Sequence, residues 1–135
     1  MKISAVSGLV IALAVATATT RDAASAGSDD DAWVKYAEQA NGDMFFYDPS
    51  RVEKIDGARR VWNRIRYRTS LMGAFSFLSL AEIDCVSQTE KTLQSTFFSD
   101  KNWEQPAMKT NMSESAKREI RKGSAMEQLA DILCD

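Results

Sequence analysis

The stretch from Arg59 to Arg68, R-R-V-W-N-R-I-R-Y-R, alternates between two kinds of side chain along its whole length. Val61, Ile65 and Tyr67 fall on one side, with Asn63 as the polar exception. A period of two with one apolar and one charged face predicts a half-buried antiparallel strand. The opposite side carries the residues that we call the arginine stripe: Arg60, Trp62, Arg64, Arg66 and Arg68.

Turn signals on both sides of this strand predict further antiparallel strands. Asn41-Gly42 and Asp56-Gly57 are typical two-residue hairpin turns, and Pro49 lies in a third turn. A loop is expected over residues 69–73. The predicted strands cover residues 33–38, 44–48, 51–55, 59–68, 74–85 and 89–98, and the first of them could instead be helical.

The C-terminal part of the chain predicts a loop followed by a helix. Residues 99–122 have weak periodicity and predict a long loop, in which residues 113–115 could begin one or two helical turns. Ser124 followed by Glu127 forms a capping box, which predicts a helix over residues 124–134. Such a short helix is marginal alone and must pack on the sheet. Its apolar residues recur at helical spacing: Met126, Leu129, Ala130 and Leu133.

The N-terminus predicts export. Lys2 precedes an apolar run over residues 3–16, and Ala24-Ser25-Ala26 is a cleavage signature. The apolar run is shorter than the roughly 20 residues that a spanning helix needs, and no later segment is apolar enough to span a membrane. We therefore expect a signal peptide over residues 1–26 and a flexible acidic leader over residues 27–31. Residues 32–135 then form one domain.

The only two cysteines of the chain, Cys85 and Cys134, remain after the predicted cleavage. In an exported protein two cysteines predict one disulfide, which here joins the end of a strand to the end of the helix. The sequence thus predicts an α+β fold. We expect a meander of about six antiparallel strands, with a C-terminal helix packed on one face and tethered by the disulfide.

The composition argues against several classes of function. The chain has no histidine, and its formal net charge is −2, which gives no support for nucleic-acid binding. Without a base for a triad, a phosphate-binding glycine loop or a CxxC pair, we expect no enzyme. Two paired cysteines cannot build a zinc site, so we expect no metal and no cofactor. Glu82 and Asp84 share a strand face and could be an acid/base pair, but a solvated face or salt bridges with the arginine strand are favoured.

The arginine stripe is the candidate binding site. Its four guanidinium groups are suited to sulfates, phosphates or acidic protein patches, which they can bind bidentately. Trp62 among them suits a binding anchor or cation–π stacking. The alternative is a charged solvent face that protects the strand from edge pairing. The expected partner is an extracellular protein or a polyanionic ligand.

Several short motifs follow one another along almost the whole predicted domain. They are Trp33, Phe46-Tyr47-Asp48, a D-G hairpin leading to Val61-Trp62, Ile83-Asp84-Cys85, Trp103 and Leu129-Ala130-x-x-Leu133-Cys134. In this order the chain resembles the bacterial surface-adhesin protein E family. The resemblance implies a curved sheet of about six strands with the helix tethered by the disulfide. It also implies an adhesin that engages host matrix or serum proteins.

We therefore expect an exported, non-enzymatic binding module at the cell surface, secreted, or in the periplasm. The alternative function is a periplasmic structural or envelope-associated domain without a host ligand.

Overall fold

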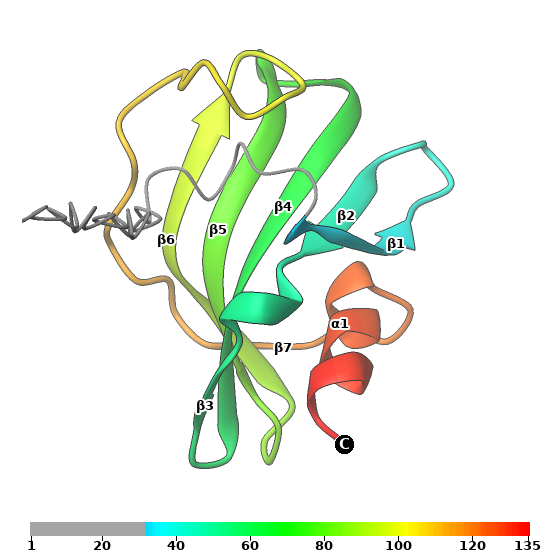
Figure 1. Ribbon diagram of the computed structural model, residues 1–135, viewed down its shortest axis with the longest axis vertical. Helices are drawn as coiled ribbons and strands as arrows, with labels where there is room; N and C mark the ends of the chain where they lie inside the picture. The colour runs from blue at the N-terminus through cyan, green and yellow to red at the C-terminus, as the bar shows by residue number, and fades with distance from the viewer. Residues whose placement is uncertain (1–31) are drawn as a thin grey trace, which may run out of the picture.

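An open antiparallel sheet and one C-terminal helix make up residues 32–135, the part of the chain that this computed structural model describes (Figure 1). The strands lie in the order β1-β2-β4-β5-β6-β7, and β3 pairs with β4. The elements are β1 (Val34–Glu38), β2 (Met44–Tyr47), η3 (Pro49–Arg51), β3 (Glu53–Ile55), β4 (Ala58–Leu71), β5 (Ala74–Asp84), β6 (Thr89–Phe98), β7 (Arg118–Glu119) and α1 (Ala125–Leu133). The predicted α+β fold is confirmed. The predicted signal peptide and leader lie outside the described residues.

Strand β4 divides its side chains between the two faces of the sheet, as the alternation predicts. Val61 pairs with Ala81 of β5, and both lie on the face that α1 covers, which we call the helix face. Arg64 pairs with Phe46 of β2 and lies on the opposite face, which we call the stripe face. The chain after β6 runs along the outer side of that strand and crosses through β7 to α1 (Figure 1).

The helix face carries the aliphatic core. Its fully buried members come from β4, β5 and α1, and they are Val61, Ala81, Ile83, Leu129 and Ala130. The predicted disulfide Cys85–Cys134 is confirmed, with the two Cα atoms 5.5 Å apart, and both cysteines pack against this core. No helix within residues 32–135 is long and apolar enough to cross a bilayer.

One of the two hydrogen bonds of the predicted capping box forms at the start of α1, and the other differs. The Glu127 amide donates to Ser124 Oγ at 3.2 Å, and Glu127 Oε1 accepts from the Gly123 amide at 3.1 Å. The reciprocal bond of the capping box thus reaches one residue further toward the N-terminus than expected. The bond to Ser124 Oγ satisfies an amide of the first turn that a helix start would otherwise leave without a partner.

The predicted strand over residues 51–55 is wrong at its start. Arg51 belongs to the turn η3, and β3 begins at Glu53. Asp48 caps this turn by accepting from the Ser50 amide at 2.9 Å, and Pro49 fits the first position because its missing N–H is not needed there. The turn moves Arg51 out of the sheet.

Two predicted loops also differ from the structure. The expected loop over residues 69–73 is strand as far as Leu71, because Met72 and Gly73 form a tight turn with φ of 52° and 88°. The expected loop over residues 99–122 contains the short strand β7, and residues 113–115 start no helix. The turn at Asn41-Gly42 is longer than two residues, since Glu38 and Met44 are the last paired residues.

Candidate binding face

Arg64, at the centre of the arginine stripe, is only 2% exposed. Its guanidinium carbon lies 3.7 Å from the ring centre of Trp103 and 4.4 Å from that of Trp33. A cation over an aromatic face is attracted by the ring quadrupole, and the attraction grows when water is excluded. Arg64 is therefore an internal cation in an aromatic cage. This corrects the expectation that its guanidinium is available to a ligand.

The cage is part of a longer alternation of cations and rings. The guanidinium of Arg51 lies 5.9 Å from the Trp33 ring and 5.5 Å from the Trp62 ring, and that of Arg66 lies 4.8 Å from the Trp103 ring. We call this arrangement the cation–π ladder, and its members in spatial order are Trp62, Arg51, Trp33, Arg64, Trp103 and Arg66. It uses all three tryptophans of the chain.

The segment after β6 positions Trp103 on the stripe face. The Trp103 indole nitrogen donates to the Phe77 carbonyl oxygen at 3.1 Å, and Arg66 Nε donates to the Lys101 carbonyl oxygen at 3.0 Å. The Asp100 carboxylate accepts from backbone amides that follow it, including that of Gln105 at 2.8 Å. Burial alone would raise the pKa of Asp100, but these bonds outweigh it and hold the pKa below its usual value.

Asp48 positions the other end of the ladder. Its carboxylate accepts from Ser50 Oγ at 2.6 Å and from Arg51 Nε at 2.6 Å, and the residue is 3% exposed. Burial would raise the pKa of Asp48, but the bonds from Ser50 and Arg51 together lower it. The ionised carboxylate thus fixes the guanidinium of Arg51 between Trp33 and Trp62.

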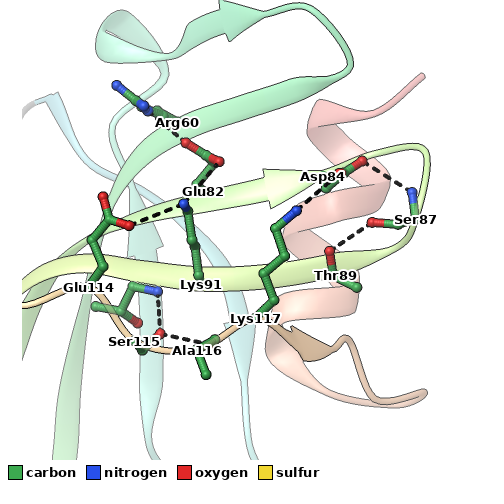
Figure 2. Close-up of polar contacts among 11 residues, drawn as sticks. Arg60, Glu82, Asp84, Ser87, Thr89, Lys91, Glu114, Ser115, Ala116 and Lys117 are labelled. Carbon is green, nitrogen blue, oxygen red and sulfur yellow. Dashed lines mark hydrogen bonds and ion pairs between the residues drawn. The ribbon is translucent and has the colours of Figure 1, made fainter.

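Arg60 belongs to a chain of ion pairs that Figure 2 shows along one end of the stripe face. Arg60 Nε lies 2.8 Å from Glu82 Oε2, and Lys91 Nζ lies 3.8 Å from Glu82 Oε1 and 3.2 Å from Glu114 Oε2. The hydrogen bond to Glu82 raises the pKa of Arg60. The salt bridge expected for Glu82 is thus present.

Asp84 does not join Glu82 in an acid/base pair. Its carboxylate accepts from the Val86 amide at 3.0 Å. Figure 2 shows its contacts with the Ser87 amide at 3.1 Å and with Lys117 Nζ at 3.8 Å. These amide bonds are the main cause that lowers the pKa of Asp84. The carboxylate therefore stabilises the turn after β5.

Arg68 is the exposed member of the stripe. Its side chain packs against Gly42, where an added Cβ would lie 2.6 Å from Arg68 Cδ. Within residues 32–135 its guanidinium makes no hydrogen bond or ion pair. Arg66, Arg68 and Lys101 line one hollow of about 330 Å³ with Glu38 and Met44. This hollow concentrates three cations at one end of the stripe face.

Trp62 lies between two further hollows of the stripe face. One, of about 430 Å³, is bordered by Arg51 and Leu80. The other, of about 380 Å³, is bordered by Leu78 and Met112. Trp62 is partly buried, so part of its ring is available to both hollows.

The stripe residues therefore share a face but not an environment. Arg64 is enclosed, Arg66 is partly covered, Arg60 is paired, and Arg68 is exposed. The alternating pattern assigned no role to Arg51 or Lys101, because neither lies in the alternating stretch. Within the described part of the chain, no cluster of three or more histidine, cysteine or acidic residues is placed to hold a metal ion.

The fold defines the chain as a small α+β domain in which a disulfide ties one helix to an open antiparallel sheet. The sequence model of the surface-adhesin protein E family matches residues 33–135, so the chain belongs to that family. No curated protein sequence matches the chain significantly.

Solved structures of protein E from Haemophilus influenzae are similar to this chain in fold. One matches with a TM-score of 0.57 and 11% sequence identity, covering 76% of this chain and 83% of that one. A second crystal form gives a TM-score of 0.56 at 11% identity and covers 76% of this chain and 87% of that one. A selenomethionine form gives 0.58 at 11% identity, with 76% and 85% covered. At this identity the similarity concerns the fold alone.

Proposed function

We propose that this chain is an exported, non-enzymatic binding module of the adhesin type. Its partner would be an extracellular protein with an acidic surface, or another polyanionic ligand. Membership of the surface-adhesin protein E family supports the adhesin-like character. The observation that carries the choice of ligand is the exposed Arg68 guanidinium beside Arg66 and Lys101.

The residues of the stripe differ in how much each would contribute to ligand binding. Arg68 and Lys101 are exposed, so they can approach an anionic group without breaking the cation–π ladder. Trp62 is a second anchor, because a partly buried tryptophan beside hollows suits an interface hot spot. Arg60 contributes less, since Glu82 already holds its guanidinium. Arg64 is buried beneath the site, so it would stabilise the site without contacting the ligand.

Retention on immobilised heparin tests this proposal. Arg68→Glu should elute at a lower salt concentration than the wild type, because a cation near the bound polyanion becomes an anion. Lys54→Glu is the matched control, since it makes the same charge change at an exposed position of β3. Equal elution of Arg68→Glu and Lys54→Glu would contradict the role given to Arg68. Arg64→Glu is unsuitable for this experiment, because Arg64 is buried and its replacement would affect folding rather than ligand binding alone.

A periplasmic structural or envelope-associated domain is the second candidate. The cation–π ladder favours it, because Arg64 and Arg66 stabilise the fold and leave less of the stripe for a ligand. Protease treatment of intact cells separates the two functions. Loss of the domain while a periplasmic marker survives would support the adhesin, and joint survival would support the envelope domain.

A further inference from the structure

The helix face contains a hollow of about 540 Å³ that the proposed function does not use. It lies on the other side of the sheet from the arginine stripe, so a binding site in it is independent of the proposed function. Its walls come from β1, β2, β4, β5 and β6, and β7 and the start of α1 close it. The residues that matter for its chemistry are Tyr36, Phe45, Asn63, Ile65, Phe77 and Glu90.

The floor of this hollow is polar although the neighbouring residues on the same face of β4 and β5, Val61, Ile65, Phe77 and Ala81, are apolar. Asn63 and Ser79 are paired across the strands and are each 3% exposed. Asn63 Nδ2 donates to Ser79 Oγ at 3.0 Å, which leaves the Asn63 side-chain oxygen as an acceptor. Burying polar side chains is unfavourable compared with the apolar packing seen at neighbouring Val61 and Ala81. A ligand site gives these polar groups a role.

Glu90 places a negative charge at the same hollow. Its side chain is 12% exposed, and Oε1 accepts from Arg118 Nε at 2.7 Å. The second oxygen, Oε2, is buried and has no hydrogen-bond partner. A buried carboxylate oxygen without a donor is costly, so a donor that enters the hollow would gain a strong bond. Tyr36 lines the same hollow, and burial, with a smaller contribution from the charge of Glu90, raises its pKa.

Aromatic rings supply the remaining walls. The ring centres of Tyr36 and Phe45 lie 6.0 Å apart, and those of Phe77 and Phe97 lie 4.7 Å apart with the rings tilted by 46°. Ring faces beside a carboxylate favour a cation with an apolar body. The cationic side chains that line the hollow do not oppose the binding of such a cation.

Arg118 is held by Glu90, and Lys91 is held by Glu114 and Glu82. Arg121 and Glu119 are exposed at the mouth and carry opposite charges. The acceptors that remain along the hollow are therefore Glu90 Oε2 and the uncharged side-chain oxygen of Asn63.

We propose that this hollow binds a protonated primary amine that carries an aromatic or aliphatic body. The ammonium group donates to Glu90 Oε2, the buried oxygen that has no hydrogen-bond partner. The apolar body packs against Phe45, Ile65 and Phe77. A carboxylate of the same shape is rejected, because Glu90 repels it.

Three probes of one shape test the proposal: phenethylamine, 2-phenylethanol and 3-phenylpropionate. They are titrated into the oxidised domain while amide and aromatic chemical shifts are followed by NMR. Phenethylamine should shift the signals of Tyr36, Phe45 and Asn63 and bind at least about tenfold more tightly than the alcohol, because only the amine makes a charge-assisted bond. The carboxylate should bind least.

The variant Glu90→Gln should weaken amine binding by about tenfold or more and leave alcohol binding unchanged. Glu53→Gln removes an exposed carboxylate of β3 outside this hollow and should leave amine binding unchanged. If Glu90→Gln fails to fold, the ranking of the three probes on the wild type decides alone. Equal binding of amine and alcohol, preference for the carboxylate, or shifts confined to other residues would overturn the proposal.

Discussion

The two faces of this sheet are held by different interactions. On the helix face, aliphatic residues of β4, β5 and α1 exclude water, and a disulfide fixes the helix. On the stripe face, guanidinium groups alternate with tryptophan rings, and the segments around η3 and after β6 cover them. One strand supplies both faces, since Val61 and Arg64 lie three residues apart in β4. A charged side chain can therefore belong to a protein interior when rings surround it.

The largest effect should come from reversing the enclosed charge of the stripe face. Arg64→Glu should destabilise the domain by about 3–5 kcal/mol, because an anion replaces the cation inside the aromatic cage. Arg68→Glu makes the same change at an exposed position and should alter stability by no more than about 0.5 kcal/mol. Urea unfolding of both variants measures the difference, and similar free energies for the two would show that the ladder is not structural.

The disulfide should be the second largest contribution, and it belongs to the helix face. Replacing Cys85 and Cys134 by serine should cost about 3–4 kcal/mol, because the bridge closes a loop with a sequence separation of 49. Unfolding of the oxidised wild type and the double variant provides the comparison. Tryptophan fluorescence of the folded variant should stay unchanged, since the rings lie on the other face. A changed spectrum would mean that the faces are coupled.

Acid should weaken the stripe face through Asp48. Because its pKa is lowered by folding, its contribution is present above the unfolded pKa of about 3.9 and is lost as the pH falls through the folded value. Asp48→Asn should therefore cost about 1–2 kcal/mol near neutral pH and almost nothing at the lowest pH. Unfolding free energies measured from neutral pH downward check this, and parallel curves for wild type and variant would contradict it.

The smallest effect should come from the exposed end of the ion-pair chain. Glu114→Gln removes the partner of Lys91 at 3.2 Å, but the glutamate side chain is 60% exposed. Exposed ion pairs contribute little, so the loss should be below about 0.5 kcal/mol. Thermal unfolding at low and high salt tests this. A decrease of several degrees in the melting temperature that salt does not reduce would contradict this and show that these ion pairs stabilise the stripe face.

The alternation in β4 predicted correctly which side chains share a face, but it did not predict which face is covered. The period of two shows to which side of the sheet each side chain points, whereas its burial depends on which other segments pack against that side. Trp33, Arg51 and Trp103 come from three separate segments, and only the folded chain brings the two tryptophan rings around Arg64 and Arg51 against Trp33. In the same way, Asn63 stood out as a polar exception, but its hollow depends on β7 and α1.

The sequence by itself determined the six longer strands to within a few residues, the hairpin at Asp56-Gly57, the capped helix and the pairing of Cys85 with Cys134. These features depend on local patterns or on the lack of any other partner for a cysteine. The tertiary structure alone decided that Arg64 is enclosed while Arg68 is exposed, and that Glu90 faces a hollow. Burial and charge pairing arise from residues distant in the chain, so residue type and spacing do not fix them.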